Sequence, residues 1–358
     1  MSGSLPHNFL DSVPGQETAK TMLFRAIGSG RIASAYLFRG PAGVGKLASA
    51  LDFVRWLKCQ SPETCQGACN SCKLIKRLNH PDLELIVPLP KSISDDPDST
   101  AVELGKIADD HFITLSFDKP ASIGIGQARA ISEWLALAPT SPGGRWAIIR
   151  DADAMTIEAA NAFLKTLEEP PEDSHIILTS SSPDYLLPTI RSRAQPISFA
   201  RMDRNQIVQI LTARGIDDKS ALDAAFHADG SISAAIEYLG DSTSEVFALA
   251  EELWVAIYSK NDSKALEFVN NSDKDRSKSL AILKAAISIL RDQSLHQIGA
   301  ESISANRSIS DRLEKASIKF PNPEPVGRAL KFLEKKAYEL RYNPQYDLFW
   351  MDTILRAR

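Results

Sequence analysis

The stretch AYLFRGPAGVGKLASALDFVRWLKC, residues 35–59, decides the fold of this 358-residue chain. Its first five residues form a short apolar run, and from residue 47 onward apolar side chains recur at helical spacing. Between them lies a glycine-rich loop that satisfies the phosphate-loop pattern GxxxxGK. A plain glycine turn is the alternative, but the strand before the loop and the helix after it favour a phosphate loop.

The chemistry of this loop predicts phosphate binding by Gly40, Gly43, Gly45 and Lys46. Glycines let backbone N–H groups face a phosphate, the helix N-terminus adds its dipole, and the lysine reaches the β and γ oxygens. The next residue is Leu47, where the full motif has Ser or Thr as a direct Mg²⁺ ligand. The loop is therefore compatible with bound ATP or ADP, but a complete Mg²⁺ site is not expected.

The alternation of strands and helices continues along the chain. Apolar runs at 146–150 and 175–179 flank a helical pattern at 157–168. Strands separated by helices predict a parallel sheet covered on both faces, which is the α/β class. Residues 87–121 begin rich in Pro, Ser and Asp, and we expect them to form a partly flexible surface excursion.

Helical patterns replace strand patterns after residue 200. Three short patterns, at 204–214, 219–227 and 232–239, predict a small helical lid. From residue 244 onward, longer apolar stripes with charged opposite faces predict a helical bundle. A surface that binds a partner is the alternative for these stripes.

The length and these patterns predict three domains. We expect an α/β domain at 1–199, a helical lid at 200–242 and an all-helical domain at 243–358.

The charge balance excludes a protein whose whole surface binds nucleic acid. Lys and Arg number 41 and Asp and Glu number 45, which gives a net charge of −4. The N-terminus has no basic segment followed by an apolar run, and no stretch of about 18 apolar residues occurs. We therefore expect a cytoplasmic chain with no membrane contact.

The four cysteines predict a metal site. Cys59, Cys65, Cys69 and Cys72 are the only cysteines of the chain, and four thiolates suffice for a tetrahedral Zn²⁺ ion. A site with four cysteines and no acid beside it has no open position for chemistry, so the expected role of Zn²⁺ is structural. Four unrelated reduced thiols are the alternative.

The run AANAFLKTLEEPPEDSHIILTSSSPDYLLPTIRSRAQPISF, residues 159–199, resembles the bacterial clamp-loader subunits of DNA polymerase III, a branch of the AAA+ ATPases. The resemblance extends to FLDSVPGQ at 9–16, to the phosphate loop and to the four cysteines. It covers most of residues 5–240, and the remainder matches only in being helical. The resemblance implies an AAA+ domain with a lid, a zinc module at the position of the cysteines, and a C-terminal collar for assembly.

The residues at the expected nucleotide site resemble the catalytically silent δ′ branch of this family more than the γ/τ ATPases. Counted back from Asn161, Arg150 stands at the place of the Mg²⁺-binding Asp and Asp151 at that of the catalytic Glu. A shift by one residue restores Asp151 as a metal ligand but leaves Ala152 in the place of the catalytic acid. In the lid, Ser233 replaces the arginine of the family's Gly-Ser-x-Arg pattern. The resemblance therefore implies that this chain does not hydrolyse ATP by itself.

The resemblance also implies a role for Arg193 in the Ser-Arg pair at 192–193. In the family this arginine enters the ATP site of a neighbouring subunit as an arginine finger. A surface arginine paired with a carboxylate is the alternative. Ser180 or Ser181 occupies the position of the first sensor, and without Mg²⁺ ligands we expect a satisfied loop hydroxyl there.

The partners implied by the resemblance are the γ/τ and δ subunits and, through the complex, the β sliding clamp and primed DNA at the nucleoid. An active γ/τ-like ATPase subunit is the second hypothesis. A zinc-dependent nucleic-acid-binding module is the third, and the net charge of −4 disfavours it.

Overall fold

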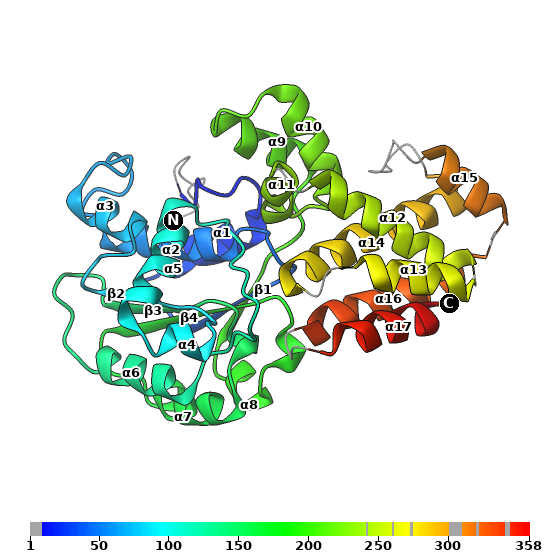
Figure 1. Cartoon of the computed structure of the whole chain (residues 1–358). Helices are drawn as coiled ribbons and strands as arrows, with labels where there is room; N and C mark the ends of the chain where they lie inside the picture. Colours follow the sequence, from blue (N-terminus) through cyan, green and yellow to red (C-terminus); the bar gives the residue numbers. More distant parts are fainter. Residues whose placement is uncertain are drawn as a thin grey trace. The chain divides into compact units, whose positions relative to one another are not determined.

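The structure, a computed structural model, describes residues 9–240, 243–259, 261–272, 275–300, 310–319, 322–340 and 344–358 (Figure 1). The chain forms two compact units. Unit 1 consists of residues up to 115, 121–218 and 230–233, and unit 2 consists of 116–120, 219–229 and 234–358. Each unit is described by itself below.

Unit 1 is built on a five-stranded parallel sheet. The strand order is β2-β3-β4-β1-β5, so β1 lies between β4 and β5. Leu37 of β1 lies opposite Leu178 on one side and Pro196 on the other. The strands are β1 (Ala35–Arg39), β2 (Leu83–Ile86), β3 (Arg145–Ile149), β4 (Ser174–Ser180) and β5 (Gln195–Ser198).

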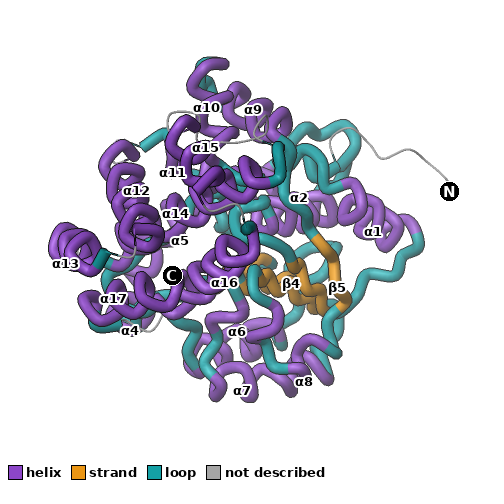
Figure 2. The backbone as a smooth tube through the Cα atoms, turned by 90° about the vertical axis from the view of Figure 1, so that its right-hand side faces the viewer, coloured by secondary structure: helices purple, strands orange, loops and turns teal. Residues whose placement is uncertain are grey.

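Helices cover both faces of this sheet because side chains alternate along each strand. Tyr36 points to the face of α2 (Lys46–Lys58), where its ring packs edge-on against Phe53 at 5.7 Å. Leu37, one residue on, belongs to the buried cluster on the other face, with α6 (Ile125–Leu135) and α7 (Ile157–Glu168). Both views show α1 and α2 on one side of the sheet and α6 and α7 on the other (Figures 1 and 2).

The remaining helices connect the strands or form unit 2. In unit 1 they are α1 (Glu17–Gly28), α3 (Asn70–Lys76), α4 (Lys91–Ser94), α5 (Pro97–Asp109), η1 (Ala152–Ala154), η2 (Pro183–Tyr185), α8 (Pro188–Arg191) and α9 (Arg204–Ala213). Lying mainly or wholly in unit 2 are α10 (Asp218–His227), α11 (Ile232–Tyr238), α12 (Thr243–Ser259), α13 (Asp262–Asn271), α14 (Arg276–Gln297), α15 (Ser310–Lys319), α16 (Pro323–Glu339) and α17 (Tyr346–Ala357).

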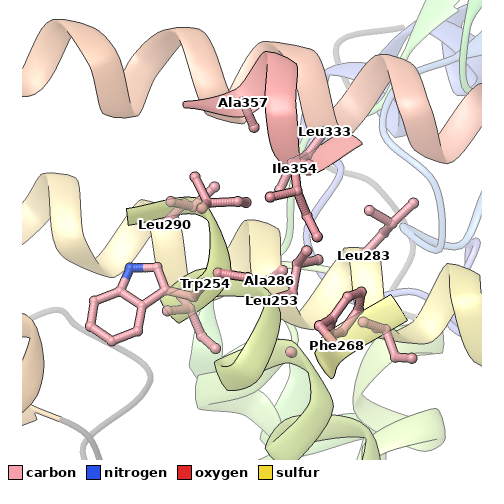
Figure 3. Close-up of a cluster of buried hydrophobic side chains, with 14 of the residues drawn as sticks. Leu253, Trp254, Phe268, Leu283, Ala286, Leu290, Leu333, Ile354 and Ala357 are labelled. Atoms are coloured by element: carbon pink, nitrogen blue, oxygen red, sulfur yellow. The ribbon is translucent and has the colours of Figure 1, made fainter. Parts of the chain in front are cut away.

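Unit 2 is a helical bundle with an apolar core. Side chains from α12 to α17 meet in one buried cluster, in which Leu253 and Ala286 lie between Trp254 and Phe268 (Figure 3). The indole Nε1 of Trp254 donates to Gln293 Oε1 at 2.8 Å, so the polar edge of this buried ring has an acceptor. The apolar stripes of this region therefore pack against one another.

The expected α/β fold followed by helices is confirmed. The strands predicted at 35–39, 146–150 and 175–179 are β1, β3 and β4, and the helix predicted at 157–168 is α7. The three short helices predicted after residue 200 are α9, α10 and α11. The division into three domains stays a prediction, and its boundary at 242 falls on a residue outside the described ranges.

The excursion at 87–121 is more regular than expected. It contains α5, a helix of 13 residues that begins with Pro97 at its first position. The carboxylate of Asp96 caps this helix by accepting from the N–H of Ser99 at 3.2 Å. Pro and Asp therefore start a helix here instead of marking an irregular loop.

β5 is an edge strand with a proline. Phe199 N donates to Arg39 O at 2.8 Å, so by alternation the backbone nitrogens of residues 196 and 198 point away from β1. Pro196 stands at one of these outward positions and has no N–H.

No helix in the described ranges is both long enough and apolar enough to span a membrane.

Candidate functional site

The glycine loop lies between β1 and α2, as predicted. Gly43 and Gly45 have φ of 72° and 85°, a left-handed conformation that favours glycine. Lys46 is buried, and its Nζ donates to Gly40 O at 2.7 Å and to Pro41 O at 2.5 Å. The ammonium group of Lys46 therefore binds two carbonyl groups of the loop itself.

Burial lowers the pKa of Lys46 to about 8. Asp151 and Asp153 act in the opposite direction, and Arg150 adds to the lowering. These effects show that the residues after β3 lie within electrostatic range of the loop.

Side chains from three distant segments pack against the loop. A Cβ placed on Gly45 would lie 2.7 Å from Val13 Cγ2 and 3.4 Å from Phe112 Cε1. A Cβ on Gly43 would lie 2.0 Å from Ser231 Oγ. Ser233 N donates to Gly43 O at 3.4 Å and its hydroxyl donates to Phe112 O at 2.5 Å. Ser233, which the resemblance compares with the family's lid arginine, is thus tied to backbone carbonyls.

The residues that the resemblance compares with Mg²⁺ ligands do not fit a magnesium ion. Leu47 is 6% exposed and belongs to the apolar core. Arg150 Nη2 donates to Ile113 O at 2.7 Å, and its Nε lies 3.5 Å from Asp151 Oδ2. An alkyl group offers no ligand, and a guanidinium repels a cation at close range.

The hydroxyl of Ser180, one of the two serines that the resemblance compares with the first sensor, has a hydrogen-bond partner, and its sensor position stays a prediction. Ser180 is buried at the end of β4, and its Oγ accepts from Ser182 N at 3.1 Å. Thr179 Oγ1 accepts from Asp151 N at 3.0 Å and fixes the turn after β3.

Arg193 lies on the surface just after α8. Its Nη2 lies 2.6 Å from Glu168 Oε1, and its Nη1 donates to Thr189 O at 2.9 Å. Both charged side chains are partly exposed, at 34% and 47%. In the single chain, Arg193 is therefore paired within its own unit, and the finger role stays a prediction.

The four cysteines come together, and their geometry fits a tetrahedral metal. All four Sγ atoms lie within 4.8 Å of one another, with Cys59 to Cys69 at 3.9 Å and Cys65 to Cys72 at 4.0 Å. Zn–S bonds of about 2.3 Å in a tetrahedron require sulfur atoms about 3.8 Å apart. The backbone N–H groups of Cys69 and Cys72 donate to Cys65 Sγ and Cys69 Sγ, which favours thiolates.

The module is anchored to the end of α2 and the start of α3. Cys59 follows the last residue of α2, and Cys69 caps α3 through its sulfur. The hydrogen bond from Cys69 N lowers the pKa of Cys65 to about 6, whereas burial raises the pKa of Cys72. A bound metal would remove the cost of ionising Cys72.

A cleft of about 500 Å³ in unit 1 was not predicted from the sequence. The segment at Asp11 and the helix α9 line it, together with Phe112 and Arg214. Arg214 makes a two-pronged ion pair with Asp110, at 2.6 and 3.0 Å, and its guanidinium lies 5.0 Å from the centre of the Phe112 ring. The residues at 110–112 come from the excursion, and no local motif marks them.

The family model described as "DNA polymerase III, delta subunit" matches residues 15–203, more than half of the chain. The chain belongs to this family. It is 26% identical over 328 residues to the DNA polymerase III subunit delta′ of Bacillus subtilis, covering 90% of each chain. It is 25% identical to the tau subunit of the same organism, covering 98% of this chain and 61% of that protein, which is less than two thirds of its length.

A solved structure of a DNA polymerase III gamma subunit-related protein from Thermotoga maritima covers 95% of this chain and is itself covered completely. Its sequence identity is 19% and its TM-score is 0.38. Membership of the family thus rests on the sequence match over 15–203.

Proposed function

We propose that this chain is a δ′-like clamp-loader subunit that does not hydrolyse ATP itself and supplies Arg193 to the ATP site of a neighbouring subunit. In this role it belongs to a cytoplasmic complex with γ/τ and δ subunits that loads the β clamp onto primed DNA. The helices after residue 243 serve as the collar that joins the subunits, and the complex acts at the nucleoid.

The observation that carries the proposal is the chemistry of the two Mg²⁺ positions. Leu47 is buried among apolar side chains, and Arg150 brings a cation to the end of β3. Phosphoryl transfer depends on metal charge at the β and γ phosphates, so hydrolysis in this chain lacks its main electrostatic support. ADP or inorganic phosphate without metal would still have to displace the Lys46 ammonium from the two loop carbonyls.

The position of Arg193 supports the second part of the proposal. The side chain is partly exposed, and its described contacts are a surface ion pair with Glu168, a hydrogen bond to Thr189 O and a long one to Ser192 Oγ. Exposed ion pairs contribute about 0.2–1 kcal/mol, so a negatively charged phosphate of a partner can replace Glu168 at small cost.

The cysteine cluster is proposed to hold structural Zn²⁺. Cys59, Cys65, Cys69 and Cys72 fill all four tetrahedral positions, so they leave none for substrate. When bound, the ion would cross-link the segment between α2 and α3, which is too short to form a core of its own. Elemental analysis of the purified chain should give one zinc per chain, and folded protein that lacks metal would rule this part out.

An active γ/τ-like subunit is the second candidate, because identity to the τ and δ′ relatives is nearly equal, 25% against 26%. Turnover by the purified chain separates the two. We expect no ATP hydrolysis above background with or without Mg²⁺. Steady hydrolysis that is lost in Lys46→Ala would support an active γ/τ-like subunit and contradict the proposal.

The positive test is reconstitution with the γ/τ and δ subunits. We expect Arg193→Ala to assemble normally and to abolish hydrolysis at one site of the complex, a loss of about 10³–10⁵-fold at that site. Arg191→Ala is the matched control, since Arg191 lies two residues away and pairs with the exposed Asp184. Equal turnover of the Arg193→Ala and wild-type complexes would remove the finger role.

A further inference from the structure

Arg55, on the side of α2, lies between the cysteine cluster and the N-terminal segment. Its Nη2 lies 2.6 Å from Asp11 Oδ1 and 3.2 Å from Asp52 Oδ1. On the other side, a Cβ placed on Gly67, within the cysteine loop, would lie 3.4 Å from Arg55 Nη1. The side chains of Arg55 and Asp52 are 19% and 7% exposed, so water screens the contact between them less than it screens the contact with Asp11, which is 47% exposed.

One donor of this guanidinium has no acceptor. Within the described part of the chain, Nε of Arg55 is buried and makes no hydrogen bond. A buried N–H of a charged group without an acceptor is costly. Burial lowers the pKa of Arg55, but the carboxylates of Asp52 and Asp11 outweigh it and raise the pKa above its ordinary value.

A tetrahedral Zn²⁺ with four thiolates carries a net charge of −2, and a neighbouring cation stabilises it. Among the contacts described above, Arg55 is the cation that lies against the cysteine loop. The same side chain holds Asp11 and Asp52, so it belongs to both the cluster and the segment before α1.

The segment from Phe9 to Val13 follows α2 from the cysteine end to the phosphate loop. Phe9 packs edge-on against Trp56 with ring centres 5.1 Å apart, and Ser12 N donates to Asp52 Oδ2 at 3.0 Å. One residue further, Val13 packs against Gly45 of the loop. Contacts of successive residues thus run along the helix between the two sites.

We propose that Arg55 is a positioning residue shared by the metal cluster and the segment 9–13, so that the metal cluster stabilises the chain that packs on the phosphate loop. The inference rests on the proposed zinc site and is independent of whether the chain hydrolyses ATP. It predicts that the metal and the segment are coupled through one side chain.

The first test measures metal affinity in the full chain. We expect Arg55→Gln to bind zinc about 10–100-fold more weakly in competition with a chromogenic chelator, because outer-shell partners of metal ligands have effects of this size. Arg55→Lys keeps the positive charge but loses the planar guanidinium with its several N–H donors. Its zinc affinity should fall between those of Arg55→Gln and wild type. Arg77→Gln, an exposed arginine after α3, is the control and should bind zinc as wild type does.

The second test separates positioning from a general loss of stability. With Co²⁺ in place of Zn²⁺, the thiolate-to-metal absorption band should shift in Arg55→Gln and return toward wild type in Arg55→Lys. Hydrogen exchange at Phe9–Val13 should speed up when wild type loses its metal. In Arg55→Gln the exchange should already be fast with metal bound.

Zinc affinity of Arg55→Gln within twofold of wild type, or unchanged exchange at 9–13 on metal removal, would overturn the inference. If Arg55→Gln does not fold, Arg55→Lys decides, and wild-type affinity in that variant overturns it. If the purified wild-type protein contains no zinc, both the proposed metal site and this inference are wrong. If it contains zinc but its zinc affinity does not change when Arg55 is substituted, only the inference is wrong. Neither result bears on ATP hydrolysis.

Discussion

Lys58 Nζ donates to Asp82 Oδ2 at 2.7 Å, and both side chains are fully buried. The same carboxylate accepts from the backbone N–H groups of Thr140 and Ser141, at 2.7 and 3.0 Å, and from both hydroxyls. Asp82 thereby ties the last residue of α2 to the start of β2 and to the loop before β3. The carboxylate has as many donors as a buried charge needs.

We expect Asp82→Asn to lower the free energy of unfolding by about 3–5 kcal/mol, because it leaves the Lys58 ammonium buried without its counter-charge. Urea unfolding followed by circular dichroism measures this loss. Asp184→Asn is the control, since the Asp184 side chain is 92% exposed, and it should change stability by less than about 0.5 kcal/mol. Equal losses in the two variants would contradict the role given to Asp82.

Acid should weaken this network. Burial by itself raises the pKa of Asp82, but the hydrogen bonds from Lys58, Thr140 and Ser141 outweigh it and hold the pKa well below its usual range. A carboxyl with a lowered folded-state pKa contributes stability above its unfolded pKa of about 3.9, and this contribution is lost as the pH falls below that value. The stability difference between wild type and Asp82→Asn should therefore be constant from pH 5 to 7 and shrink below about pH 4. If the stability difference between wild type and Asp82→Asn grows as the pH falls, the lowered pKa of Asp82 is contradicted.

Gly43 and Gly105 should respond oppositely to alanine. Gly43 has a left-handed backbone, and a Cβ there would lie 2.0 Å from Ser231 Oγ, so Gly43→Ala should cost about 1–3 kcal/mol. Gly105 lies inside α5 with open space at its Cβ position, so Gly105→Ala should stabilise the chain by about 0.5–1 kcal/mol. Urea denaturation of the two variants measures the sign of each change in the free energy of unfolding. If Gly43→Ala stabilises the chain, the contact with Ser231 is absent in solution.

Glu168 holds Arg193 in the single chain, so its removal should free the arginine. In the reconstituted complex we expect Glu168→Gln to raise ATP turnover by at most about fivefold, because an exposed ion pair contributes no more than about 1 kcal/mol. Glu169→Gln, which changes the neighbouring exposed carboxylate, should leave turnover unchanged. A clear fall of turnover in Glu168→Gln would show that Glu168 assists the arginine instead of restraining it.

Local patterns predicted the elements that build the site. The run from Ala35 to Lys58 contains its own strand, turn and helix signals, and the close spacing of Cys59 to Cys72 was sufficient to expect that these four residues meet. In contrast, the Pro, Ser and Asp content around Asp96 and Pro97 predicted a partly flexible excursion and gave no sign of α5. The same residue types are common at the first turn of a helix, so composition alone could not separate the two cases.

Contacts between distant segments could not be predicted from local sequence. Phe112 reaches Gly45 across 67 positions of the chain, and Arg214 pairs with Asp110 across 104. Such contacts depend on how the excursion folds back over the sheet, for which spacing within one segment carries no signal. The place of Arg55 between the cysteine loop and Asp11 was missed for the same reason.

Pro196 has a consequence for how proteins can meet at the β5 edge of the sheet. The outward position that it occupies offers no N–H, so an incoming strand would lack a donor in the middle of a four-residue edge. The proline therefore disfavours lengthening of the sheet by a strand from a neighbouring chain. It also makes edge-to-edge association of unassembled chains less favourable at this strand.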